Sequence, residues 1–199
     1  MHKGRLEAFS DGVIAILITI MVLELKVPHE PTLAAMRPLI PILLSYALSF
    51  VFLGIYWNNH HHMLQAARNV DGRVLWANLH LMFWLSLVPF ATNWMGETSA
   101  ATLPVALYGV VLALCGVAYY ILAQLLVSLH GSESTLGKAL GSDVKGRISL
   151  AIYLTAIPLA FVSKWIALAC YVAVAIMWLV PDLRIERAMR ESADDSHGA

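Results

Sequence analysis

The segment from Arg5 to Leu25, RLEAFSDGVIAILITIMVLEL, constrains the fold of this chain more than any other. It is long and apolar enough to cross the roughly 30 Å hydrocarbon core of a bilayer as one helix. It nevertheless carries the carboxylate of Asp11, beside Ser10, near its start. An ionisable group inside a membrane helix is costly unless it is paired, so it marks a candidate functional site. The segment predicts a membrane helix with a functional polar end.

Composition points to a membrane protein throughout. The chain is 59% hydrophobic and only 13% charged, with a mean hydropathy of +0.71. Its formal net charge is zero, so no basic surface predicts nucleic-acid binding. Cys115 and Cys170 lie in apolar stretches without metal-like spacing, which predicts small packing residues and no disulfide. Because Asp11 and Glu24 interrupt the first apolar run, we expect a retained span and not a cleaved signal peptide.

Apolar stretches bounded by charges and turn residues predict an all-α protein with six membrane helices. The long stretch from Ile148 to Val180 exceeds one span, so we expect a helical hairpin that turns near Lys164. Residues 1–183 then form one six-span domain, and residues 184–199 form a polar cytoplasmic tail. The proline-rich linker between the first two spans is expected to be a stiff connection. The expected spans are Leu6–Leu25, Leu39–Asn58, Val74–Trp94, Thr102–Leu129, Ile148–Val162 and Trp165–Leu183.

Lysine and arginine residues set the expected orientation. All of the 13 basic residues except Lys26, Arg37 and Lys164 fall on one side of the six spans. Cytoplasmic loops carry the excess of Lys and Arg, so both termini are predicted to be cytoplasmic.

This topology places three polar clusters at one depth near the cytoplasmic ends of the first three spans. Ser10 and Asp11 lie on the first span, His60 at the end of the second and Asn78 on the third. We expect Ser10 and Asp11 to bond to His60 and Asn78, with Arg5 closing the network, because buried membrane charges usually pair. The alternative is that Asp11 only caps the N-terminus of its helix.

The run His60-His61-His62 resembles a metal site but is not expected to be one. Consecutive helical residues point about 100° apart, so the three imidazoles cannot converge on one ion. No metal or other cofactor is predicted.

One face of the first span combines small, branched and hydroxylated side chains. Gly12, Ile16, Thr19 and Leu23 are spaced by four, three and four residues, so they line up along a helix. Such a stripe can line an ion pathway below the acidic residue. It can equally be a packing surface, since small residues suit close helix contact in membranes.

The chain resembles the transmembrane protein 175 family, the potassium-permeable channels of lysosomes and bacteria. The resemblance rests on Arg5 with Phe9-Ser10-Asp11, on Leu23-Glu24-Leu25, on Trp57-x-x-His60, and on Asn78-Leu79 and Pro89-Phe90. It covers the first three spans, whereas the last three match only in number and length.

The resemblance implies a single-repeat prokaryotic channel of the plasma membrane. It implies a homotetramer in a lipid bilayer, with the first span of each subunit around the axis. Ile16 then falls on the constriction, Thr19 on a hydroxyl layer and Leu23 on an outer apolar layer. The resemblance implies passage of K⁺ and other monovalent cations without the TVGYG carbonyl filter of other potassium channels, a sequence that is also missing here.

Two other functions must be weighed against a channel. A proton-coupled secondary transporter would also keep Asp11 and His60 inside the membrane as a relay, although its site is expected at the midplane and these groups lie at one end. An intramembrane metalloenzyme would need a motif such as HExxH, and none occurs, so no enzymatic activity is predicted.

Overall fold

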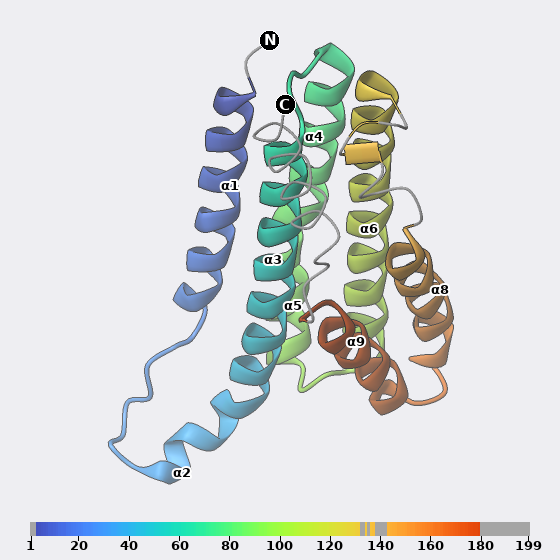
Figure 1. Ribbon diagram of the computed structural model, residues 1–199. Coiled ribbons are helices and arrows are strands. Elements are labelled where there is room, and N and C mark those ends of the chain that lie inside the picture. The colour runs from blue at the N-terminus through green and yellow to red at the C-terminus, as the bar shows by residue number, and fades with distance from the viewer. Residues whose placement is uncertain (1–2, 132–133, 135, 138–142, 180–199) are drawn as a thin grey trace.

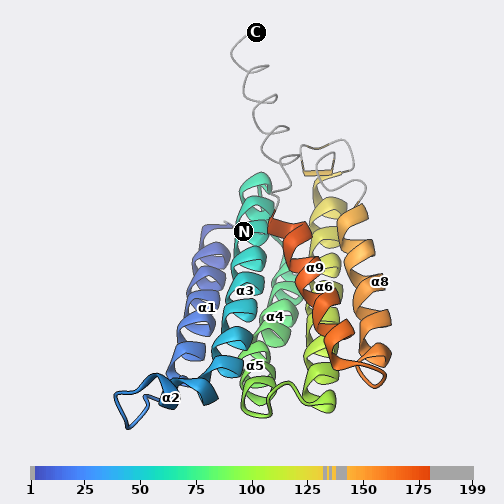
Figure 2. The same ribbon diagram turned by 90° about the horizontal axis from the view of Figure 1, so that it is seen from below.

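The computed structural model describes residues 3–131, 134, 136–137 and 143–179, and these residues form helices and no strands. In both views α1 lies at one flank of the bundle and α8 at the opposite flank (Figures 1 and 2). The helices are α1 (Gly4–Leu23), α2 (Leu33–Met36), the 3₁₀ helix η1 (Arg37–Leu39), α3 (Ile40–Ala66), α4 (Gly72–Ser86), α5 (Val88–Glu97), α6 (Thr102–His130), α8 (Val144–Leu159) and α9 (Lys164–Leu179).

The six expected helical segments are present as α1, α3, α4 with α5, α6, α8 and α9. Four helical stretches among the described residues are long and apolar enough to cross a membrane: Gly4–Leu23, Leu33–Ala66, Gly72–Glu97 and Thr102–His130. The helices α8 and α9 are shorter, with 16 residues each, and the chain turns between them just before Lys164 as predicted. The end of the sixth expected span and the tail 184–199 lie outside the described residues.

Three predicted boundaries were wrong. The second span extends past Asn58 to Ala66, so the three histidines lie on a helix. Its linker is also partly helical, because the Thr32 hydroxyl accepts a bond from the Ala35 amide and caps α2. The third span is divided at Leu87, since Pro89 in the first turn of α5 has no amide hydrogen to continue the helix.

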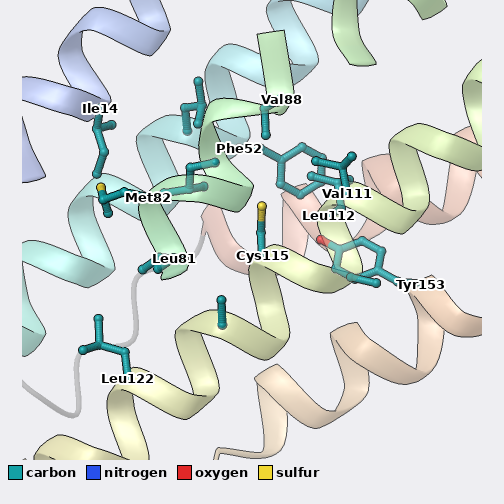
Figure 3. Packing of buried hydrophobic residues seen from close by; sticks show 14 of the residues in the cluster. Ile14, Phe52, Leu81, Met82, Val88, Val111, Leu112, Cys115, Leu122 and Tyr153 are labelled. Carbon is teal, nitrogen blue, oxygen red and sulfur yellow. The ribbon is translucent and has the colours of Figure 1, made fainter. Parts of the chain in front are cut away.

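The helix α6 forms the centre of the helical bundle, in contact with α4, α5, α8 and α9. Its residues Val111, Leu112, Cys115 and Leu122 lie among apolar side chains from the other helices (Figure 3). One polar cluster is enclosed there, in which the Ser49 hydroxyl bonds to Thr92 at 2.6 Å and to Tyr108 at 2.9 Å.

Side-chain contacts at the two ends of the bundle agree with the predicted layering. At one end, Nζ of Lys3 donates to the carbonyl oxygens of Leu64 and Gln65, at the C-terminus of α3. At the other end, Lys26 lies 3.4 Å from Glu97 and Lys164 donates to the carbonyl of Ser99. The starts of α1 and α4 and the end of α3 therefore share one end of the bundle.

Candidate functional site on the first helix

The helix α1 has one buried face and one exposed face. Its buried residues are spaced by four, four, three and four positions, and the helix packs against α3, α4 and α5. Ile14 is completely buried and points toward Met82 of α4 (Figure 3). The buried residues are Leu6, Ser10, Ile14, Leu17 and Met21.

The predicted pore stripe lies on the exposed face. Ile16 is 56% exposed and Leu23 is 79% exposed, and Gly12 and Thr19 are also exposed. The Thr19 hydroxyl donates back to the carbonyl oxygens of Ala15 and Ile16, at 3.1 and 2.9 Å. The hydroxyl proton is therefore used within the helix, and the exposed oxygen can still accept a bond. The described part of the chain does not use this stripe for its own packing.

A buried polar layer joins α1 to α4 and α3. The amide Nδ2 of Asn78 donates to Oγ of Ser10 at 2.9 Å, and Oδ1 of Asn78 lies 2.7 Å from Nε2 of His60. Ser10 in turn donates to the carbonyl of Leu6. All three side chains are fully buried. These bonds join Ser10, His60 and Asn78, three of the residues that were predicted to lie at one depth on the first three spans.

The bonding pattern assigns the protons of this layer. Since Asn78 uses Nδ2 as donor, its Oδ1 is the acceptor, and His60 carries its hydrogen on Nε2. The opposite ring nitrogen, Nδ1 of His60, is buried without a hydrogen-bond partner in the described part of the chain. A neutral imidazole satisfies this arrangement, because the bare Nδ1 has no hydrogen that needs an acceptor.

Asp11 pairs with a different residue than predicted. Its Oδ1 accepts a bond of 3.1 Å from the indole Nε1 of Trp57, and not from His60. Trp57 lies one helical turn before His60 on α3, so the two candidates share a face and differ only in depth. The capping alternative is excluded, because α1 begins at Gly4 and places Asp11 beyond its first turn.

Arg5 does not close the network. Its side chain is exposed and makes no hydrogen bond or ion pair among the described residues. Instead, Glu7 joins the start of α1 to the end of α3, since its Oε1 lies 3.2 Å from Nδ1 of His61. The His61 ring in turn stacks on Trp57. Glu7, Trp57 and His61 were missing from the predicted network, although all three flank its members in the sequence.

The histidine run does not form a metal centre in the described part of the chain. The three rings have different neighbours: His60 contacts Asn78, His61 contacts Glu7 and Gln65, and the His62 ring lies edge-on to His61 at 5.8 Å. No group of three or more His, Cys, Asp or Glu side chains among the described residues is placed to hold a metal ion.

Together these features define a multi-pass membrane protein whose edge helix is fixed by a buried polar layer and leaves one apolar face open. Residues 5–89 match the model of a family described as the endosomal/lysosomal potassium channel TMEM175. The chain is 50% identical over 192 residues to potassium channel HX13_20290 of a Chryseobacterium species, a match that covers 96% of this chain and 100% of the relative. The chain belongs to the TMEM175 family of ion channels.

More distant relatives agree with this assignment. Potassium channel B446_29190 of Streptomyces collinus is 28% identical, over 89% of this chain and 91% of the relative. The crystal structure of a lysosomal potassium-selective channel TMEM175 homolog from Chamaesiphon minutus matches with a TM-score of 0.77. It is 27% identical, and the match covers 90% of this chain and 97% of that one.

Proposed function

We propose that this protein is a potassium-permeable cation channel of the bacterial plasma membrane. In this proposal four copies assemble with α1 of each subunit around a central pore. The observation that carries the proposal is the exposed stripe of Ile16, Thr19 and Leu23, which is opposite the face that α1 buries in its own subunit. The bacterial relatives are named potassium channels, which supports the choice of ion.

Conduction would be controlled at Ile16. Four isoleucine side chains around an axis form an apolar neck, which closes to ions when water leaves it. A small rotation or outward movement of α1 would rewet the neck. Potassium holds its hydration shell less tightly than sodium, so a neck that strips water favours potassium moderately. The Thr19 oxygens lie one turn away and can replace part of the lost water.

The polar layer would act as a positioning device and not as an ion ligand. Ser10, Asn78 and His60 are fully buried within the subunit, so they do not reach the exposed face that carries Ile16. Asp11 and Trp57 add a second link between α1 and α3 at the same end. These contacts would hold the rotation and depth of α1, and with them the width of the neck.

Single-channel recording tests the proposal directly. Purified protein is reconstituted in bilayers with potassium on one side and sodium on the other, and wild type is compared with Ile16→Asn. We expect discrete openings with a reversal potential that favours potassium. The variant should give larger or less gated current with weaker selectivity, because an amide wets the neck.

Val22→Asn is the matched control for this measurement. Val22 is also exposed, at 44%, but it lies six residues from Ile16 and points about 120° away around the helix. It should conduct like wild type. If neither the wild type nor Ile16→Asn gives current while proton-coupled, saturable uptake is seen, the protein is a transporter and the proposal is wrong. Light scattering of the same samples checks the tetramer.

A further inference from the structure

A cavity of about 230 Å³ lies between α3, α6, α8 and α9. It is far from the face proposed to line a pore, because α1 packs on α3, α4 and α5, and α8 forms the opposite flank (Figures 1 and 2). The channel function proposed above does not use it. Its lining is largely aromatic and includes Phe52, Tyr56, Tyr119, Tyr153 and Trp178.

The cavity is apolar at its inner end and charged at its mouth. Phe52 and Tyr153 meet at the apolar end with ring centroids 6.5 Å apart, and Tyr56 and Tyr119 meet further along at 6.1 Å. Asp143 and Arg147 line the other end, at the start of α8. From Asp143 to Tyr153 the chain advances ten residues, about 15 Å in a helix. The cavity therefore runs from a charged rim into the apolar layer.

A cationic side chain at the mouth has no partner among the described residues and favours an anion there. The guanidinium of Arg147 is exposed and makes no hydrogen bond or ion pair with any described residue. The Asp143 carboxylate is already engaged, because it accepts from the amide of Gly146 and caps α8. Asp143 and Arg147 are the two charged side chains among the described residues that line the cavity. Because the carboxylate is held by the backbone amide of Gly146, the Arg147 guanidinium is the group at the mouth that can bind an anion.

We propose that this cavity binds a phospholipid with an anionic headgroup. The phosphate lies on Arg147, and the first part of one acyl chain lies among the aromatic rings. Basic pockets between membrane helices bind anionic lipid headgroups in this way. The bidentate geometry of a guanidinium suits a phosphate oxygen pair. The aromatic interior excludes a purely polar ligand such as free phosphate from most of the volume.

Gly116 of α6 is the residue that keeps this space open. A Cβ atom added there would have only the Tyr56 hydroxyl within 4 Å, at 3.9 Å, so a larger side chain would enter the cavity without striking the backbone. Substitution at Gly116 therefore blocks the acyl part, and substitution at Arg147 removes the headgroup contact.

Native mass spectrometry of the full chain in detergent tests the proposal. The probes are palmitoyl-oleoyl phosphatidylglycerol, phosphatidylcholine with the same chains, and soluble glycerol 3-phosphate. We expect phosphatidylglycerol to bind with one lipid per subunit and to be retained better than phosphatidylcholine. Arg147→Gln should weaken phosphatidylglycerol about tenfold or more, as for loss of a charge-assisted bond. Gly116→Leu should weaken both lipids, and glycerol 3-phosphate should not compete.

Arg68→Gln is the matched control, since Arg68 is an exposed arginine in the loop after α3 and does not line the cavity. It should bind both lipids like wild type. Equal binding by wild type, Arg147→Gln and Gly116→Leu would overturn the proposal, as would an equal loss in Arg68→Gln. If glycerol 3-phosphate instead competes with phosphatidylglycerol equally well in wild type and in Gly116→Leu, then Arg147 belongs to a surface anion site and the cavity does not bind lipid. Arg147→Gln alters only an exposed side chain, so the comparison of its lipid binding with that of wild type remains valid even if Gly116→Leu fails to fold. None of these readouts requires channel current.

Discussion

The helices α1 and α6 are both long and apolar enough to cross a membrane, yet they relate to the bundle in different ways. In its most apolar window α6 has 44% of its residues buried, whereas α1 has 28%. α6 is enclosed by four other helices, while α1 is attached along one face. Lipid chains solvate an apolar surface about as well as leucine does, so the open face of α1 carries no penalty in a bilayer. The core helix thus organises the bundle, and the edge helix has a face that is available for contacts outside it.

The largest expected effect is a difference in the free energy of unfolding between substitutions on the two faces of α1. Ile14→Ala removes a completely buried side chain and should lower the free energy of unfolding by about 2–5 kcal/mol, because it leaves a cavity. Thermal unfolding in detergent, followed by tryptophan fluorescence, measures the change.

Ile16→Ala is the control, two positions along the same helix. It should change subunit stability by no more than about 0.5 kcal/mol, as for an exposed residue. An equal loss in both variants would mean that α1 is not divided into a packed face and an open face.

A glycine substitution examines the packing of α6. A Cβ atom at Gly109 would strike the Tyr171 hydroxyl and lie 2.7 Å from Cζ of the same ring, which is fully buried and bonded to the Val105 carbonyl. Gly109→Ala should therefore cost about 1–3 kcal/mol through overpacking. Gly116→Ala on the same helix has room for its methyl group and should be nearly neutral. Similar melting temperatures for the two variants would contradict the tight contact between α6 and α9.

Loss of the polar layer between α1 and the bundle should change the position of α1 more than it changes the free energy of unfolding. Asn78→Leu keeps the number and branching of the side-chain heavy atoms but removes the bonds to Ser10 and His60. Interhelical polar contacts in membranes contribute modestly, so we expect a loss of about 1–2 kcal/mol for the pair of bonds. Cysteine cross-linking between α1 and α4 should then show more than one register. A single unchanged register with full stability would show that the apolar contacts alone fix α1.

The smallest effect is a pH dependence outside the spans. The Val74 amide, with a further contribution from Arg73, lowers the pKa of the Asp71 carboxyl that caps α4. A lowered pKa in the folded state adds stability above the ordinary value and loses it as the pH falls through the lowered one. Asp71→Asn keeps a capping oxygen but removes this titration. Its melting temperature should change less than that of wild type as the pH falls below about 4, and a parallel decline in both would contradict the assignment.

The sequence predicted more about α1 than about the rest of the molecule. The polar residues Ser10, His60 and Asn78 were expected at one depth, because the topology places the relevant ends of three spans together. The choice of Trp57 over His60 as the partner of Asp11 could not be predicted, since it depends on a shift of one helical turn between α1 and α3. The break at Leu87 had a signal in Pro89, and the start of α2 had one in Thr32. The cavity between α3, α6, α8 and α9 had no signal in the sequence, because Gly116, Arg147 and Trp178 meet only through the packing of α6, α8 and α9.

Ser10 fixes the position of α1 along the membrane normal. The buried positions one turn before and after it are Leu6 and Ile14, and neither can accept a hydrogen bond from the side chain of Asn78. A slide of α1 by one turn would preserve most apolar contacts, which are interchangeable in a membrane, but would strand the Asn78 amide without its acceptor. The Ser10 hydroxyl thus fixes the position of α1 along its own axis. The height at which Ile16 and Thr19 lie in the membrane is therefore set at Ser10, six and nine residues earlier in the helix, by a hydroxyl that no ion on the open face would touch.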